Sequence, residues 1–305
     1  MNFKKILITG SAGLLGRHVV RELMPHSRVI GFDLKKSDES IEQIIGSTTD
    51  IASVIASFKG VDAVIHVAAR PNIWSGTGEQ ILKDNVIGAW NVLQAAEEAK
   101  VKRVVLCSSD SVIGFTVMSG NLKRPEYLPI DTSHVLRPTD PYALSKQISE
   151  TMGRSFFERG NIEIIALRPV FVLYEEMYGE VKARAKDPSN YKGPAVGGPS
   201  AAGGGPLWHY VDPRDVASAF RCALEVPVLP KFECLFISAS TTLAPNPTIE
   251  RMSAFSNQEY EIRRPEIYIN NPYAPLYDLS ETEKVIGFTP KYDLRHLLYC
   301  CLLYT

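Results

Sequence analysis

Tyr142 and Lys146, four positions apart, are the side chains of this sequence best suited to moving a proton. On a helix, residues four apart share a face, so the two can act together. A free phenol has a pKa of about 10, and a nearby ammonium favours its ionised form, which brings Tyr142 toward the range useful for a base. Ser109 supplies a hydroxyl that can hydrogen-bond the reacting oxygen. Together these residues predict proton transfer at a hydroxyl-bearing carbon.

The spacing alone does not single out this pair, because Tyr178 and Lys182 repeat it. The surroundings separate the two pairs. Tyr142 lies in a helical pattern, 141–159, that begins with a proline and stands between two strand-like runs. Tyr178 lies instead in a stretch rich in glycine and proline. We therefore predict Tyr142 as the base and give Tyr178 no role.

A glycine-rich turn near the N-terminus follows the apolar run 6–8 and precedes a helical pattern. Gly10 permits a tight turn, Gly13 lets the backbone approach a pyrophosphate, and Gly16 lets the helix pack on the strand. The helix start offers unpaired N–H groups to the phosphates. Asp33 ends the next strand, where a carboxylate accepts both hydroxyls of an adenosine ribose and repels a 2′-phosphate. The pattern predicts bound NAD.

Three further residues bear on this cofactor. Lys35 and Lys36 are a local argument for NADP, since cations near the ribose can meet a 2′-phosphate, but Asp33 opposes them. Asp50 opens a short helix, where it is either an N-cap or a contact to adenine. Lys146 can also hold the nicotinamide ribose, which aligns the hydride with the substrate carbon. NAD remains the predicted cofactor, ahead of NADP.

Strand-like and helical patterns alternate along most of the chain, which is typical of a doubly wound parallel sheet. The expected strands are 6–8, 28–32, 61–67, 101–107, 162–167, 208–211 and 232–237, and the expected longer helices are 80–100, 141–159 and 213–225. Residues 35–42 are polar and predict a surface connection. The expected fold class is α/β, of the Rossmann type.

The composition changes in two places. Residues 174–206 are rich in glycine, proline, lysine and tyrosine and predict a loop-rich cap. The chain after 240 carries many prolines and predicts irregular structure with short helices. We therefore expect the main sheet to occupy 1–171 plus about 208–240, with 172–207 and 241–305 outside it.

The composition also argues against some classes of binding partner. A net charge of −1 argues against nucleic acid, and no apolar run approaches the roughly 20 residues of a membrane helix. The short apolar tail after 296 is expected to dock on the protein. The cysteines form no CxxC pair and no even framework, which predicts free thiols, a cytoplasmic location and no metal site. They are Cys107, Cys222, Cys234, Cys300 and Cys301.

In this order, the motifs resemble the extended short-chain dehydrogenase/reductase family, which includes NAD-dependent epimerases and dehydratases. The resemblance is carried by Thr9–Gly16 with its TGxxGxxG spacing, Ser109, Tyr142 with Lys146, Leu167-Arg168-Pro169, and the ending Ile286-Gly287-Phe288-Thr289-Pro290. It implies an NAD-binding domain from 1–171 plus about 208–240 and a smaller substrate-binding domain from 172–207 plus 241–305. It also implies that Asn85 supports the proton relay, although by itself this residue reads as an amide on a helix surface.

The resemblance implies further cofactor contacts and an assembly. The expected cofactor contacts are Leu14, Leu15, Ile51, Val67, Ala68, Ala69, Pro169 and Val170. Helices 80–100 and 141–159 would form a homodimer interface. The first of these helices is apolar on more than one side, which agrees with such a role.

Departures from the family pattern narrow the activity. Ser111 stands where dehydratases of the family carry a glutamate, so dehydration is not expected. The family's tyrosine is replaced by Ile113, and no Tyr-Gly-Pro follows the Arg-Pro pair. No pocket for a nucleotide diphosphate is evident. Arg263 and Arg264 either grip phosphates or form a solvated pair.

Residues 79–85 and the Ser-Ser-Asp-Ser segment are loosely similar to uronate dehydrogenases of this family, which oxidise free sugar acids. Arg70 and Asn72 would then meet a carboxylate, unless they are surface residues, and Ser111 and His209 would lie at the substrate, unless the histidine is structural. We expect an NAD-dependent dehydrogenase acting on a sugar or sugar-acid hydroxyl. The alternatives are a nucleotide-sugar epimerase with tightly held NAD and a non-catalytic NAD-sensing protein.

Overall fold

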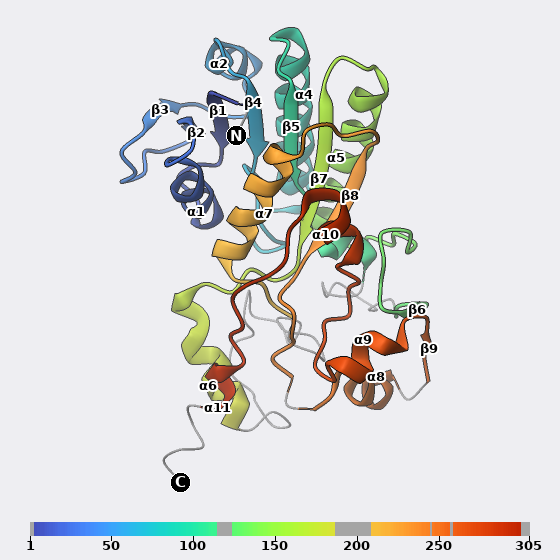
Figure 1. Cartoon of the computed structure of the whole chain (residues 1–305). Coiled ribbons are helices and arrows are strands. Elements are labelled where there is room, and N and C mark those ends of the chain that lie inside the picture. Colours follow the sequence, from blue (N-terminus) through green and yellow to red (C-terminus); the bar gives the residue numbers. More distant parts are fainter. Residues whose placement is uncertain (1–2, 115–123, 187–208, 245, 257–258, 300–305) are drawn as a thin grey trace.

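The core of the protein is a seven-stranded parallel sheet in the order β3-β2-β1-β4-β5-β7-β8 (Figure 1). The structure, a computed structural model, describes residues 3–114, 124–186, 209–244, 246–256 and 259–299. The strands are β1 Lys5–Thr9, β2 Arg28–Asp33, β3 Glu42–Ile45, β4 Ala63–His66, β5 Arg103–Cys107, β7 Glu163–Pro169 and β8 Glu233–Ile237. The chain runs outward from β1 in one direction and then from β4 in the other. This confirms the doubly wound α/β fold.

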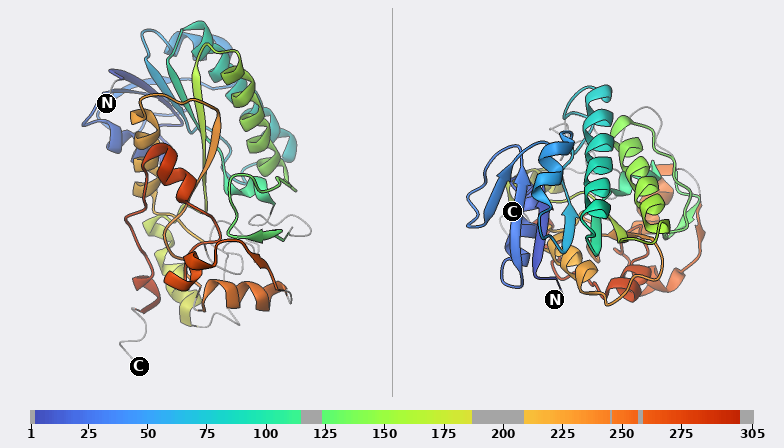
Figure 2. Two further views of the ribbon diagram at one scale, coloured as in Figure 1. Left: turned by 45° about the vertical axis from the view of Figure 1, so that its right-hand side comes forward. Right: turned by 90° about the horizontal axis from the view of Figure 1, so that it is seen from above.

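Helices cover both faces of the sheet, as the two views in Figure 2 show. One hydrophobic cluster joins the sheet to α1 and α7, and a second joins its other face to α2, α4 and α5. These helices are α1 Leu14–Leu23, α2 Ile51–Ser57, α4 Gly88–Glu98, α5 Pro141–Glu158 and α7 Pro213–Glu225. Ile6 and Ile8 belong to the first cluster and Leu7 to the second. A strand buried on both faces reads as an unbroken apolar run, which is why β1 was predictable.

Helix starts follow the capping residues of the sequence. The side chains of Asp140 and Asp212 accept backbone N–H groups at the starts of α5 and α7, and each is followed by a proline in the first turn. Thr77 and Gln80 form a capping box before α3. The predicted helix 80–100 is three successive pieces: α3 Gly78–Leu82, the π-helical turn η1 Lys83–Ile87, and α4.

Three predictions of local structure need correction. Residues 42–45 form β3, a parallel edge strand beside β2, although Glu42 was expected to end a surface connection. Residues 209–211 form no strand, and Val211 makes an isolated bridge to Val172; Trp208 lies outside the described residues. The predicted loop-rich cap contains helical turns, η3 Glu175–Met177 and α6 Tyr178–Lys186, and its remainder from 187 lies outside the described residues.

The chain after β8 is a series of short elements, most of which lie below the sheet in Figure 1. They are α8 Thr248–Ser256, β9 Glu261–Ile262, α9 Pro265–Asn270, α10 Ser280–Ile286 and α11 His296–Tyr299. Strand β9 pairs with β6 Tyr127–Leu128, which lies between β5 and α5 in the chain. The expected short helices are therefore present. None of the helices in the described part of the chain is long and apolar enough to cross a membrane.

Candidate active site

A cleft of about 780 Å³ opens where the parallel strands end. Segments that directly follow β1, β2, β3, β4, β5 and β7 line it, as expected for the ligand crevice of an open α/β sheet. Its lining includes most of the predicted site residues: Gly10, Gly13, Leu14, Leu15, Gly16, Asp33, Val67, Ala68, Ala69, Arg70, Asn72, Ser109, Tyr142, Lys146, Pro169, Val170 and His209. Four predicted residues do not line it: Asp50, Ile51, Asn85 and Ser111.

Backbone atoms approach so closely at the glycine turn that side chains are excluded. Gly10 has a φ of +72°, and a Cβ there would lie 2.6 Å from the backbone nitrogen of Ala68. A Cβ on Gly16 would lie 1.9 Å from the carbonyl oxygen of Gly10. The backbone N–H of Ala12 donates to the Asp33 carboxylate at 2.9 Å, which ties the turn to the end of β2. The turn leaves a backbone-lined surface of the kind a pyrophosphate needs.

Asp50 acts as the N-cap of α2. Its carboxylate accepts the backbone N–H of Ala52 at 3.1 Å and the hydroxyl of Ser53 at 2.5 Å. The N-cap that the sequence offered for Asp50 is thus present, and Ile51 follows it into the helix. Contact of Asp50 and Ile51 with adenine stays a prediction. The segment 46–49 after β3 lines this end of the cleft instead. It was missed because β3 itself was not predicted.

Tyr142 and Lys146 lie on α5, with the Lys146 Nζ 5.7 Å from the centre of the Tyr142 ring. The ammonium donates to the carbonyl oxygen of Cys107 at 2.7 Å. Desolvation by the surrounding protein raises the pKa of Tyr142, while a hydrogen bond with Ser109 acts in the opposite direction. Burial also lowers the pKa of Lys146. Without a bound cofactor, desolvation is the largest influence, so the pKa of Tyr142 lies above its usual value and not nearer to neutrality.

Asn85 is buried in the π-helical turn and is not a surface amide. Its Oδ1 accepts the backbone N–H of Arg70 at 2.7 Å, and its Nδ2 donates to Ser145 Oγ at 2.9 Å. Ser145 in turn donates to the carbonyl oxygen of Tyr142 at 2.7 Å. Single π turns inside helices are frequent at functional sites. Here the turn places an amide that connects the Arg70 loop to the start of α5.

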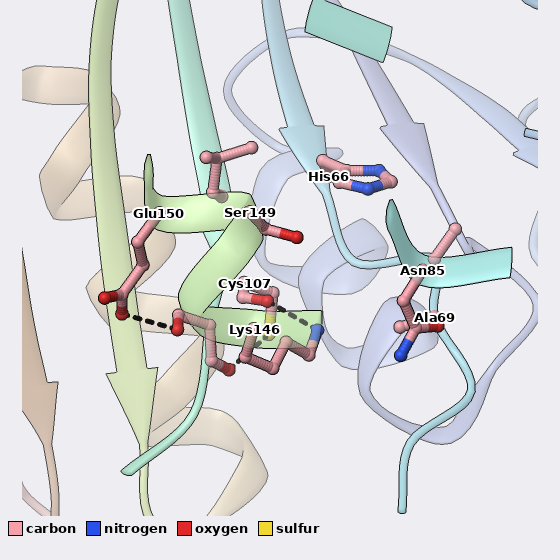
Figure 3. Close-up of a pocket in the computed structure, with 10 residues that line it drawn as sticks. His66, Ala69, Asn85, Cys107, Lys146, Ser149 and Glu150 are labelled. Atoms are coloured by element: carbon pink, nitrogen blue, oxygen red, sulfur yellow. Dashed lines mark hydrogen bonds between the residues drawn. The ribbon is translucent and has the colours of Figure 1, made fainter. Parts of the chain in front are cut away.

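A second, small cavity of about 10 Å³ lies beside Lys146, a volume that suits one water molecule. Figure 3 shows Lys146, Asn85 and His66 among the side chains that line it. His66 Nδ1 lies 2.7 Å from the Thr9 hydroxyl. Burial, with a smaller contribution from the Lys146 charge, lowers the pKa of His66 to about 3. This histidine is therefore neutral at physiological pH.

Glu150, which also lines this small cavity, connects three segments of the site (Figure 3). Its carboxylate accepts the Ser108 hydroxyl at 2.6 Å. Arg168, at the end of β7, donates to the same carboxylate through Nε at 2.7 Å and Nη2 at 2.8 Å. Both side chains of this ion pair are buried. Sequence reasoning missed Glu150, although its position four residues after Lys146 puts it on the same face of α5.

Two residues predicted to bind the substrate, Arg70 and Asn72, already have hydrogen-bond partners within the protein. Arg70 forms an ion pair with Asp84 at 2.6 Å and also donates to the carbonyl oxygen of Ser75. Asn72 lines the cleft and caps a turn by accepting the backbone N–H of Trp74 at 3.0 Å. The guanidinium expected to meet a substrate carboxylate is thus already paired.

Ser111 is buried away from the cleft, where its hydroxyl has no hydrogen-bond partner in the described structure. His209 lines the cleft with its ring 5.7 Å from that of Tyr277, and burial lowers its pKa to about 4. Arg263 pairs with Glu261 and Arg264 with Glu266, and neither lines the cleft. The alternative of a solvated arginine pair is therefore favoured.

Sequence reasoning also missed part of the wall of the cleft. The missed residues include 73–75, Phe171, Val172, Tyr174 and Met177. They lie in the loop after β4 and in the segment after β7, and only this position relative to the strands could have identified them. Within the described part of the chain, no three His, Cys, Asp or Glu side chains gather as a metal site.

Comparison with known proteins identifies the family. The model of the NAD dependent epimerase/dehydratase family matches residues 6–233. A uronate dehydrogenase of Pseudomonas syringae is 32% identical over 175 residues, covering 54% of this chain and 58% of that protein. The L-arabinose 1-dehydrogenase (NAD(P)(+)) of Haloferax volcanii is 30% identical over 169 residues, covering 54% and 65%. The matches thus span less than two thirds of these relatives.

Solved structures share the fold. A short-chain dehydrogenase/reductase superfamily protein from Agrobacterium tumefaciens, solved with bound NAD, superposes with a TM-score of 0.72 at 24% identity, covering 98% of this chain and 96% of that one. The UDP-glucose 4-epimerase of Thermotoga maritima gives a TM-score of 0.68 at 20% identity, covering 98% of both chains. With the family model matching most of its length, the chain belongs to the NAD dependent epimerase/dehydratase family.

Proposed function

We propose that this protein is an NAD-dependent dehydrogenase that oxidises a hydroxyl carbon of a sugar or sugar acid. One observation carries the proposal: a single cleft holds the glycine turn and Asp33 at one end and Ser109, Tyr142 and Lys146 at the other. A dinucleotide and a small substrate both fit a cleft of about 780 Å³. The curated relatives named a uronate dehydrogenase and an L-arabinose 1-dehydrogenase support a free sugar substrate.

The residues at the glycine turn fit NAD. Gly10, Gly13 and Gly16 leave backbone N–H groups and no side chains where a pyrophosphate would lie, and Asp33 would accept the adenosine ribose hydroxyls. Val67, with the alanines after it, would lie against the flat rings. When bound, NAD supplies the acceptor for a hydride.

The side chains at the other end of the cleft would remove the proton from the substrate hydroxyl. Ser109 would donate a hydrogen bond to the substrate oxygen and hold it close to Tyr142. The Tyr142 phenolate would take the hydroxyl proton as the carbon is oxidised. Lys146 donates one ammonium hydrogen to the carbonyl oxygen of Cys107 and lines the cleft. An ammonium has three donors, so the other two would stabilise the phenolate and hold the cofactor ribose. Asn85 would support the relay by fixing the start of α5.

The test is the absorbance of NADH, followed with purified protein, NAD or NADP, and a panel of sugars, sugar acids and nucleotide sugars. NADH produced with a free sugar or sugar acid supports the proposal and identifies the substrate. NAD that copurifies, together with a changed nucleotide sugar and no net NADH, would replace it with an epimerase. If NAD binds but no substrate is turned over, the result would support the alternative of a non-catalytic NAD-sensing protein.

We also propose a homodimer formed through helices 80–100 and 141–159. Ile87, Trp90 and Leu144 on these packed helices are 43%, 40% and 40% exposed, which supports a covered apolar face. Light scattering on the purified protein should give twice the chain mass. A Leu144→Glu variant should give the mass of one chain, and a monomeric wild type would rule the interface out.

Two coarser expectations are retained as proposals. The division into an NAD-binding domain, 1–171 plus about 208–240, and a substrate domain, 172–207 plus 241–305, is supported by the large sheet, whose strands all lie in the first part. A cytoplasmic location is supported by the free thiols of the described cysteines, Cys107, Cys222 and Cys234; Cys300 and Cys301 lie outside the described residues.

A further inference from the structure

Trp74 lines the cleft from the loop between β4 and α3, and it is 40% exposed. Its backbone N–H donates to Asn72 Oδ1 at 3.0 Å, and the hydroxyl of Ser75 donates to the carbonyl oxygen of Asn72 at 2.6 Å. The guanidinium of Arg70 donates to the carbonyl oxygen of Ser75 and also pairs with Asp84. Hydrogen bonds on both sides therefore hold the indole at a defined place in the wall of the cleft.

Both ends of this loop are attached to the start of α5, where Tyr142 lies. At its start, the hydrogen bonds of Asn85 join Arg70 to the first turns of α5. At its end, a Cβ on Gly78 would lie 3.0 Å from the side chain of Pro141, the residue before Tyr142. The indole comes from the middle of the loop and lines the same cleft as Tyr142. It therefore belongs to the end of the cleft where the substrate would react.

Trp90 provides a comparison, because it is exposed to the same extent as Trp74. The indole of Trp90 donates to Gln94 Oε1 at 3.1 Å and packs edge-on against Phe156, with ring centres 5.3 Å apart. Trp90 does not line the cleft. Among the described residues, the indole of Trp74 has no such hydrogen bond or ring contact. The exposed part of the Trp74 ring is therefore available to a molecule in the cleft.

The face of an aromatic ring is apolar and carries negative partial charge. A cyclic sugar has a face of C–H groups with slight positive charge, so the two can stack while the hydroxyl groups at the edge of the sugar ring keep their hydrogen bonds. We propose that Trp74 is a binding platform on which the ring of the sugar stacks, beside Tyr142. The inference rests on the proposed dehydrogenase function and adds to it a residue that selects the ring form of a sugar.

Steady-state kinetics of the full-length enzyme with saturating NAD provide the first test. The probe is the sugar with the highest kcat/KM among D-glucose, D-galactose, L-arabinose, D-glucuronate and D-galacturonate. Trp74→Ala should raise the KM of this sugar by about tenfold with little change in kcat, because the groups that move the proton are untouched. Trp74→Phe keeps an aromatic face and should return the KM to within about threefold of the wild-type value. Trp74→Leu is apolar without an aromatic face and should not return it.

Tryptophan fluorescence provides a readout that a loss of stability would not reproduce. In a Tyr142→Phe background, the sugar and NAD can bind without turnover, and stacking should change the emission of the indole. The sequence contains three tryptophans, which can be replaced separately. Trp74→Phe should abolish the change in emission caused by the sugar. Trp90→Phe is the matched control and should retain it.

The outcomes separate this inference from the proposed function. An unchanged KM in Trp74→Ala, or a KM that Trp74→Leu restores as fully as Trp74→Phe, overturns the role of Trp74 and leaves the dehydrogenase in place. A dissociation constant for NAD that rises as much as the KM of the sugar also overturns it, because the indole would then contact the cofactor.

An absence of NADH with every sugar and sugar acid overturns the proposed function itself, and the inference with it. If Trp74→Ala does not fold, the fluorescence of Trp74→Phe decides alone. A sugar-induced change in emission that survives in this variant overturns the stacking.

Discussion

The two ends of the cleft are built in different ways. At the glycine turn, the closest contacts are between backbone atoms: a Cβ on Gly16 would meet the carbonyl oxygen of Gly10 at 1.9 Å. At the Lys146 end, buried side chains hold the site together: Glu150 joins Ser108, 42 residues away, to Arg168, 18 residues away. The first end is specified by a few neighbouring residues. The second exists only once distant segments have folded together.

The largest expected effect is on kcat, and it comes from removing the hydroxyl oxygen of Tyr142 at one end of the cleft. Tyr142→Phe takes away the proposed base, and we expect kcat to fall by about 10² to 10⁴, the usual contribution of general acid–base catalysis. The dissociation constant for NAD, measured by calorimetry, should change little because the glycine turn is untouched. Tyr178→Phe, in the other Tyr-x-x-x-Lys, is the matched control and should retain turnover. Turnover that survives Tyr142→Phe would contradict the proposed mechanism.

Glu150→Gln tests whether the Lys146 end depends on its buried ion pair. The change leaves Arg168 buried without its counter-charge, and breaking such a pair costs about 3–5 kcal/mol of unfolding free energy. Urea unfolding, followed by circular dichroism, should show a much lower midpoint than the wild type. Glu158→Gln on the same helix is exposed and should keep the wild-type midpoint. Equal midpoints for the two variants would mean that the Glu150 network does not support the site.

The contrast between the ends also explains what the sequence could predict. The glycine turn, Asp33 and six of the seven strands of the large sheet are local patterns, and each was predictable. The edge strand β3 was not, because its four residues, none of them fully buried, follow a polar stretch without the apolar run of a central strand. The segment 46–49, which follows β3 and lines the cleft, was therefore not predicted either.

Contacts between residues far apart in the chain could not be predicted from the sequence either. Arg70 reads as a free guanidinium until the fold brings Asp84 to it, and Asn85 reads as a surface amide until the π-helical turn rotates it inward. The pKa of Tyr142 likewise depends on surroundings that the sequence does not show. Spacing reveals that Lys146 is near, but not how strongly the surroundings desolvate the phenol.

Two buried histidines predict that the stability of the protein depends on pH. His66 lines the small cavity beside Lys146 and His209 lines the main cleft, with pKa values lowered by burial to about 3 and about 4. The unfolded chain binds protons on these residues at higher pH than the folded protein does. Stability is therefore lost as the pH falls below about 6.5, by about 2 kcal/mol per histidine between about pH 7 and pH 5.

Urea unfolding of the wild type and of His66→Asn and His209→Asn across this pH range measures the effect. Each variant should show a shallower fall in stability than the wild type, since it has one buried titrating group fewer. Similar changes in slope would mean that the two histidines are shielded from water to the same degree. A wild type whose stability is flat between pH 7 and pH 5 would contradict the burial of both histidines.

The smallest expected effect concerns two aspartates at the adenosine end, which differ in what their carboxylates do. Asp33 lines the cleft and holds the glycine turn through Ala12, so Asp33→Ala should weaken NAD binding by about tenfold. Asp50 caps α2 and lies outside the cleft lining, so Asp50→Ala should lower the unfolding midpoint slightly and leave the NAD dissociation constant unchanged. Calorimetric titration of both variants with NAD compares them directly. If Asp50→Ala weakened NAD binding as much as Asp33→Ala does, the cofactor would have to extend beyond the cleft as far as α2, and recognition at this end would depend on a side chain that local geometry assigns to helix capping alone.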